Sequence, residues 1–182
     1  QLPFLQVHLK KTFKIVPIIL GTYKPEIIKK IANTLKPFFN SENLFIISSD
    51  FSHYPNYEDA CIIDDKTAEI IISNNVENLL NHIKNIQNYD ISNLSTPVCG
   101  WTSVLVLMYL TNNNDNYIYH KIKYMNSGDI SGDISKVVGY WSIVVEKNNK
   151  KSAYKTMPEL LNKNSTDNEF LLSDNDKITL LK

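Results

Sequence analysis

The sequence of 182 residues contains no arginine, and its net charge is formally zero. All of its basic side chains are lysines, which are scattered along the chain instead of gathered in one block. Surfaces that bind nucleic acid need clustered positive charge and favour the planar fork of arginine. The composition therefore argues against a nucleic-acid-binding protein.

Long apolar runs are also missing from the sequence. A helix that spans a membrane needs about 20 consecutive, mostly apolar residues, and no run here approaches that length. The sequence also shows no pattern typical of a signal peptide. We therefore expect no membrane segment in these residues.

Cysteine is scarce, since Cys61 and Cys99 are the only two and form no CxxC pair. This usage favours a reducing compartment and hence a cytoplasmic protein, with a disulfide between the two cysteines as the open alternative. A chain of this length can bury a core without disulfides. The length fits one domain, or one domain with a piece of a second.

Apolar patterning in the first third of the chain predicts alternating strands and a helix. Residues 12–20 are apolar and β-branched, which predicts a buried strand, at an edge or bulged because Pro17 lies inside it. Residues 24–39 carry apolar side chains at helical spacing after Pro25, and residues 43–50 predict a second strand. The order strand, helix, strand predicts a βαβ unit with parallel strands.

The middle of the chain predicts three helices and then a strand pair. Helical patterns cover residues 58–75 and 75–86, and the apolar residues 96–111 favour a buried helix over a strand. Residues 116–126 alternate between polar and apolar, and residues 134–147 predict their partner strand. The expected fold class is therefore α/β, a largely parallel sheet flanked by helices with a C-terminal antiparallel strand pair.

The last part of the chain changes in character. Residues 147–169 are polar and lack periodicity, which predicts a linker. Residues 170–182 regain a helical pattern, with Ser173 as a suitable N-cap. The expected organisation is one domain over residues 1–146, a linker, and the start of a second domain.

A polar cluster follows the predicted strand 43–50, where Asp50, Ser52 and His53 occur close together. In open α/β sheets, binding sites form beyond the carboxyl ends of the strands. One helical turn would bring Asp50 and His53 to the same side, and imidazole transfers protons near neutral pH. These residues form a candidate catalytic site. The alternative, weighted equally, is a turn capped by Ser49 and Asp50.

Two further sites come from Cys99 and from the loop of residues 127–133. Cys99 opens a predicted helix, where backbone N–H groups stabilise a thiolate, although such a cysteine is more often a small apolar filler. The loop contains two glycines and two aspartates, which suit a hard metal ion or ordinary Asx-turns, with turns slightly favoured. His82 is predicted on a polar helix face and His120 on the outer face of a strand, so both are interpreted as incidental.

Five segments in this order resemble the Memo-like family, the protein B component of the AmmeMemoRadiSam system: QLPFLQ, FKIVPIILG, LFIISSDFSHY, TPVCGWTSVLVLMYL and NSGDISGDISKVVGYWSIVV. The resemblance covers residues 1–146. Residues 170–182 are similar to the first helix of an AMMECR1 domain, the protein A component. The resemblance thus implies a Memo-like domain that lacks its N-terminal part, followed by the start of a truncated AMMECR1-like domain.

The resemblance also implies a fold like that of class III extradiol dioxygenases, where two histidines and a carboxylate hold ferrous iron. In this likeness His53 is an acid/base group beside the metal, and Asp50 orients it. Two metal-binding histidines are expected upstream of Gln1, and Asp129 is the expected third ligand, with Asp133 as the next candidate. The same likeness places Ser49, Ser52 and Cys99 around the pocket.

Three functions follow from the resemblance as expectations. The first is a metal-dependent, redox-related enzyme or accessory factor that uses an iron or copper ion. The second is a non-catalytic binding module that holds a small molecule or peptide and acts with a radical-SAM partner. The third is a structural half of a fusion protein. The expected partners are an AMMECR1-like domain, which we expect to be fused, and a radical-SAM protein, with no nucleic acid and no membrane.

Overall fold

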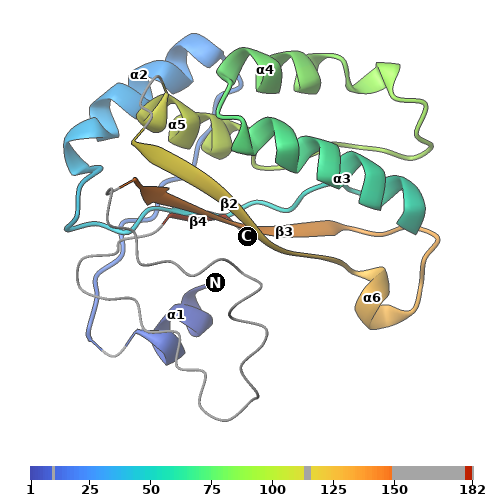
Figure 1. Ribbon diagram of the computed structural model, residues 1–182, viewed down its shortest axis with the longest axis horizontal. Coiled ribbons are helices and arrows are strands. Elements are labelled where there is room, and N and C mark those ends of the chain that lie inside the picture. Colours follow the sequence, from blue (N-terminus) through green and yellow to red (C-terminus); the bar gives the residue numbers. More distant parts are fainter. Residues whose placement is uncertain (10, 113–115, 149–178, 182) are drawn as a thin grey trace.

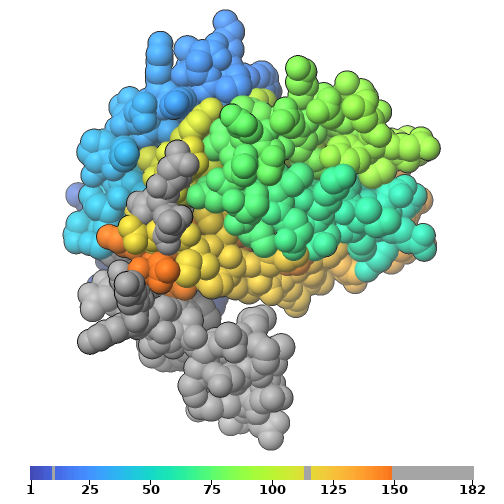
Figure 2. Space-filling model, turned by 45° about the horizontal axis from the view of Figure 1, so that its top comes forward, coloured from blue at the N-terminus to red at the C-terminus, as the bar shows by residue number. Residues whose placement is uncertain are grey.

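The computed structural model describes residues 1–9, 11–112, 116–148 and 179–181. Four helices lie on one side of a single sheet (Figure 1): α2 (Pro25–Leu35), α3 (Tyr57–Ile72), α4 (Val76–Lys84) and α5 (Trp101–Thr111). The short helix α1 (Leu2–His8) lies on the opposite side of the sheet. Figure 2 brings the helical layer forward, and α3 and α4 (green) form one continuous surface there.

The sheet has the strand order β1-β4-β3-β2. Its strands are β1 (Ile46–Ile47), β2 (Tyr117–Asn126), β3 (Gly139–Lys147) and β4 (Thr179–Leu181). Strands β2 and β3 are antiparallel, with a register shift between Lys121 and Lys123, whereas β1 runs parallel to β4. The expected α/β class and the C-terminal antiparallel pair are therefore confirmed. The sheet is mixed rather than largely parallel, because among the described strands only the β1–β4 pair is parallel. Helix α6 (Gly128–Ser131) lies at the far end of the β2–β3 pair.

Helix α5 lies in the core, as its uniformly apolar sequence predicts. Leu105, Leu107 and Met108 are fully buried, and Ile28 and Ala32 of α2 belong to the same core. Although α5 is apolar on all sides, it contains only 11 residues. Among the described residues, no helix combines the length and the apolar character that crossing a membrane requires.

The predicted helix starts at α3 and α4 are confirmed by their capping contacts. The Asn56 side chain accepts a hydrogen bond from the N–H of Asp59, and the Asn75 side chain accepts one from the N–H of Asn78. Each contact satisfies a backbone donor that the first helical turn leaves without a partner. Two single 3₁₀ turns, η1 (Lys36–Phe38) and η2 (Ile86–Asn88), follow α2 and α4.

The strand expected over residues 12–20 does not form, so this prediction is wrong. The segment has no regular secondary structure, and most of its apolar side chains are exposed, with Ile19 95% exposed, whereas Leu20 packs against the core. A strand needs a neighbour to satisfy its backbone groups, and none of the described strands pairs with this segment. Pro17 also removes one backbone donor. The predicted βαβ unit is therefore not formed, and the parallel neighbour of β1 is β4 instead.

The prediction of a helix over residues 170–182 is wrong at its end. Residues 179–181 form β4, which pairs with β1 on one side and with β3 on the other. A short apolar segment fits either a helix or a strand, and here the two neighbouring strands supply backbone partners. Lys147 belongs to β3 rather than to a linker. The predicted linker from 149 onward and the predicted helix start at Ser173 lie outside the described residues.

Candidate functional site

His53 is held by backbone hydrogen bonds rather than by the helical turn that the sequence suggested. It forms isolated bridges with Thr96 and Val138. Its N–H donates to the carbonyl of Thr96 (3.1 Å), and its carbonyl accepts from the N–H of Ser95 (3.0 Å). The loop that follows β1 is therefore paired with the segments around Thr96 and Val138, which fixes the position of the imidazole.

The residue after His53 has an uncommon backbone conformation. Tyr54 has a φ angle of 74°, in the left-handed region that bulky residues rarely adopt. Its N–H donates to the carbonyl of Val137 (2.8 Å), which holds the chain in this conformation. Such outliers persist where the surrounding contacts determine the backbone, and they are common at functional sites.

Asp50 and His53 lie side by side, as predicted. The His53 Nε2 and the Asp50 Oδ2 are 3.5 Å apart, and the Asp50 side chain is 47% exposed. This distance is too long for a good hydrogen bond. The His53 Nε2 is itself buried and has no hydrogen-bond partner among the described residues. A buried imidazole nitrogen without a partner is an atom that can bind a ligand.

Cys99 lies against Asp50 at the start of α5, where Gly100 is the N-cap. The Cys99 Sγ accepts the N–H of Asp50 (3.2 Å), and the Cys99 N–H donates to the Asp50 carbonyl (3.1 Å). Ser49 reinforces the contact, because its Oγ accepts the N–H of Gly100 (2.8 Å) and donates to the Asp50 carbonyl (2.7 Å). These bonds fix the sulfur beside the carboxylate.

Asp50, His53 and Cys99 form one group, in which one ligand atom from each lies within 4.8 Å of the others. Atoms bound to a common transition metal lie about 3 to 4 Å apart, given bond lengths of about 2.0 to 2.3 Å. The three side chains therefore need only a small approach to share an ion. A carboxylate, an imidazole and a thiolate together suit zinc, iron or copper, so the donor set fits the expected metal.

Asp129 and Asp133 lie outside this group. The Asp129 carboxylate accepts the N–H of Asn126 (2.7 Å) and the hydroxyl of Tyr57 (2.7 Å), and these bonds lower the pKa of Asp129. The Asp133 carboxylate accepts from the hydroxyl and the N–H of Ser135, which lowers the pKa of Asp133. The contacts of Asp129 with Asn126 and of Asp133 with Ser135 are ordinary turn contacts, whereas the Tyr57 hydroxyl reaches Asp129 from α3. The role of Asp129 as a metal ligand stays a prediction.

Ser52 does not contribute its side chain to the group, and it leads to a residue that the sequence analysis missed. Its hydroxyl is fully buried, and its N–H donates to Asp64 of α3 (2.8 Å). Asp64 is also fully buried, and burial raises its pKa to about 6. The signal in the sequence is that Asp64 shares a helix face with Ala60, Ile63 and Ala68, where an apolar side chain is the usual occupant.

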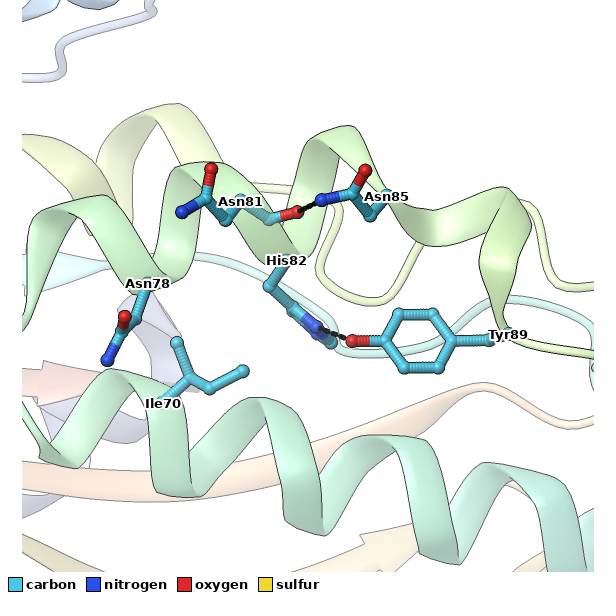
Figure 3. A pocket seen from close by; sticks show the side chains of 6 residues that line it. All are labelled: Ile70, Asn78, Asn81, His82, Asn85 and Tyr89. Carbon is cyan, nitrogen blue, oxygen red and sulfur yellow. Dashed lines mark hydrogen bonds between the residues drawn. The ribbon is translucent and has the colours of Figure 1, made fainter.

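His82 is buried, contrary to the prediction of a polar helix face. Its Nε2 lies 2.8 Å from the Thr67 hydroxyl, and its Nδ1 lies 2.7 Å from the Tyr89 hydroxyl. Burial lowers the pKa of His82 to about 4. His82 and Tyr89 line a shallow hollow of about 260 Å³ between α3 and α4 (Figure 3). Because both ring nitrogens are occupied, His82 has a structural role.

The remaining sequence candidates have local partners. The His120 Nε2 lies 3.0 Å from a carboxylate oxygen of Glu146, and its side chain is partly exposed, as predicted for the outer face of a strand. Cys61 and Cys99 are both free thiols, so the alternative of a disulfide does not apply to this structure. Cys61 is half-buried near Asn126, and burial raises its pKa.

The sheet, covered on one side by α2 to α5, and the Asp50–His53–Cys99 group define an α/β protein with side chains that could hold a metal ion. The family described as "Memo-like protein" matches residues 1–144 of the chain. The chain therefore belongs to the Memo-like family, which confirms the resemblance of residues 1–146 to that family.

Curated relatives agree with this assignment. A MEMO1 family protein of Methanosarcina mazei is 32% identical over 156 residues, covering 80% of this chain and 53% of the relative. The MEMO1 family protein Ta0237 of Thermoplasma acidophilum is 31% identical over 144 residues, covering 79% of this chain and 50% of the relative. One from Desulfurococcus amylolyticus is 34% identical over 143 residues, with coverages of 77% and 47%. The chain thus spans about half the length of the curated relatives it matches.

Proposed function

We propose that this protein is a metal-binding, redox-related enzyme or accessory factor, and that Asp50, His53 and Cys99 supply ligand atoms to its metal. The observation that carries the proposal is the convergence of three different donor atoms within 4.8 Å. The buried His53 Nε2, which has no hydrogen-bond partner among the described residues, supports it. The partial exposure of Asp50 gives an ion a route to the group.

Each residue has a distinct task in this proposal. An iron or copper ion, when bound, would supply the one-electron and oxygen chemistry typical of mixed nitrogen, oxygen and sulfur sites. Asp50 offers its carboxylate, while its backbone N–H holds the Cys99 sulfur in place. Ser49 bridges the Asp50 carbonyl and the N–H of Gly100, which keeps the strand end and the helix start together.

The family likeness supports a second role for His53, as a proton carrier oriented by Asp50 beside a metal that other side chains hold. The Asp50 Oδ2 lies 3.5 Å from the His53 Nε2, so a small approach of the carboxylate would let it orient the imidazole. The two roles predict different outcomes for His53→Ala. A ligand role predicts weaker metal binding, whereas a proton-carrier role predicts unchanged metal content and an altered pH profile of turnover.

The test is an anaerobic titration of the reduced full chain with Co²⁺, which reports a bound thiolate through a near-ultraviolet charge-transfer band. We expect one ion per chain and a band that Cys99→Ser abolishes. Cys61→Ser is the matched control, because it removes the other free thiol and leaves the group intact. A chain that binds no Co²⁺, or a band that survives Cys99→Ser and disappears in Cys61→Ser, would overturn the proposal.

We also propose, from the family likeness, that the protein acts in the AmmeMemoRadiSam system beside an AMMECR1-like domain and a radical-SAM protein. The alternative function, a binding module with a dioxygenase-like pocket, is favoured by the exposure of Asp50 and Cys99, which a small molecule or peptide could reach. Co-purification with a radical-SAM protein distinguishes the two. Capture that is unchanged by His53→Ala and by chelation supports the binding module, whereas capture that needs the metal supports the first function.

A further inference from the structure

The carboxylate of Asp64 is buried, and the charge of His53 acts on it. Asp64 lies on α3 and is fully buried. In the described part of the chain no lysine forms an ion pair with it, whereas the adjacent Asp65 is exposed and pairs with Lys121. A buried carboxylate is costly unless hydrogen bonds compensate it. Its partners therefore indicate what the residue does.

Those partners come from two other parts of the chain. The Asp64 Oδ1 accepts the N–H of Ser52 (2.8 Å), and the Oδ2 accepts the hydroxyl of Tyr124 on β2 (2.7 Å). Ser52 lies between Asp50 and His53 in the sequence, so its peptide group is part of the backbone that joins these two side chains. One carboxylate thus connects α3, the sheet and the loop that carries the candidate ligands.

Gly139 at the start of β3 completes this arrangement. A Cβ at Gly139 would overlap the Asp64 carboxylate, so a larger residue cannot occupy this position without displacing it. The Gly139 N–H donates to the Ser52 carbonyl (2.9 Å), and its carbonyl accepts the N–H of Phe51 (2.8 Å). The absence of a side chain at Gly139 therefore lets the loop and the carboxylate pack against the same point of the strand.

We infer that Asp64 is the positioning residue of the Asp50–His53–Cys99 group, because it holds the Ser52 peptide that sets the spacing of Asp50 and His53. The position of Asp50 relative to Cys99 does not depend on Asp64, because the Asp50 N–H and carbonyl bond directly to the Sγ and the N–H of Cys99. The His53 side depends on Thr96, on Val138 and on the Ser52 peptide that Asp64 fixes. Burial raises the pKa of Asp64 to about 6, and the hydrogen bonds from Tyr124 and Ser52 oppose that rise because they favour the charged carboxylate.

This inference rests on the proposed function for its metal-binding measurement. Removing a residue that orients metal ligands costs about 10- to 100-fold in metal affinity. We therefore expect Asp64→Ala to weaken Co²⁺ binding by about that factor and to shift the charge-transfer band. Asp64→Asn should restore most of the affinity, since its oxygen can accept from Ser52 while its amide approaches the Tyr124 hydroxyl as a donor. Asp65→Ala is the matched control and should bind like the unmodified chain.

The inference would be overturned if Asp64→Ala folds and binds Co²⁺ with unchanged affinity and an unchanged spectrum. It would also be overturned if Asp65→Ala lost as much Co²⁺ affinity as Asp64→Ala does. If Asp64→Ala does not fold, Tyr124→Phe is the second variant, because it removes one hydrogen-bond donor and keeps the carboxylate. We expect its Co²⁺ affinity to stay within about threefold of the unmodified chain, well below the loss of about 10-fold or more that follows removal of an orienting residue. A loss of about 10-fold or more there would assign the positioning to Tyr124 instead of Asp64.

A metal-free measurement separates this inference from the proposed function. The backbone amide resonance of His53, measured by NMR at one pH without metal, reports the position of the peptide that carries the imidazole. We expect it to shift in Asp64→Ala and to return in Asp64→Asn. If the unmodified chain binds no Co²⁺, the proposed function fails, and this resonance still decides the role of Asp64. An unchanged His53 amide resonance in Asp64→Ala would then overturn the inference.

Discussion

Replacing Asp64 by asparagine should change how the stability of the protein depends on pH. Burial raises the pKa of Asp64 to about 6 from its ordinary value of 3.8, so the folded state binds this proton more tightly than the unfolded state does. The contribution of Asp64 to the free energy of unfolding is therefore fully present below pH 3.8. It is lost as the pH rises through about 6.

The size of the effect follows from the difference between the two pKa values, which corresponds to about 3 kcal/mol. In Asp64→Asn, the amide that replaces the carboxylate carries no charge at any of these pH values and can still bond to Ser52 and Tyr124. The stability of Asp64→Asn relative to the unmodified chain should therefore increase by about 2 to 3 kcal/mol between pH 4 and pH 8, since at pH 4 the unfolded Asp64 is already partly charged. All other titrating groups are shared, so the difference between the two proteins isolates Asp64.

The assay is urea unfolding followed by circular dichroism, under reducing conditions with a chelator, at several values between pH 4 and pH 8. Asp65→Asn is the control, because Asp65 is exposed and neighbours Asp64 on the same helix. It should show a pH profile close to that of the unmodified chain. Parallel profiles for Asp64→Asn and the unmodified chain would refute the account of a buried, charged Asp64.

Three further predictions concern other contacts. Gly139→Ala should lower the urea midpoint strongly because its Cβ would overlap Asp64, and an equal cost in an Asp64→Ala background would contradict this reason. Burial keeps His82 neutral in the folded state. The contribution of His82 to the free energy of unfolding is therefore fully present above pH 6.5 and is lost as the pH falls through about 4. His82→Gln should therefore remove up to about 3 kcal/mol of acid sensitivity in urea titrations, and an unchanged acid sensitivity would contradict the prediction. Asn75→Ala should cost about 1 kcal/mol in the same assay through the lost cap of α4, whereas a cost near zero would speak against that cap.

The parts of the fold that could be predicted from the sequence are those decided by local contacts. Asn75 and its helix could be predicted because the cap lies three residues from its donor. Helix α5 could be predicted because its side chains are apolar on every face. The strand expected over residues 12–20 fails for the opposite reason, since a strand depends on a neighbour that patterning does not reveal. The same dependence turned the predicted end helix into β4.

The residues of the candidate site also fall into those that sequence rules identify and those that they miss. Asp50 and His53 follow a strand and Cys99 precedes a helix, so general rules for α/β sheets and helix starts identify all three. Asp64 was missed because an acid on a helix is exposed in most proteins, although it shares a helix face with Ala60 and Ile63, and the packing of Gly139 against it agrees with its burial. His82 was misplaced because its partner Thr67 belongs to another helix.

X-ray absorption spectroscopy of the Co²⁺-loaded chain tests the central claim most directly, because it identifies the atoms bound to the metal. If Asp50, His53 and Cys99 are ligands, the spectrum contains one sulfur at about 2.3 Å with nitrogen and oxygen atoms at about 2.0 to 2.2 Å. The sulfur contribution should vanish in Cys99→Ser and persist in Cys61→Ser. A spectrum of nitrogen and oxygen alone, identical in the unmodified chain and in Cys99→Ser, would contradict the account.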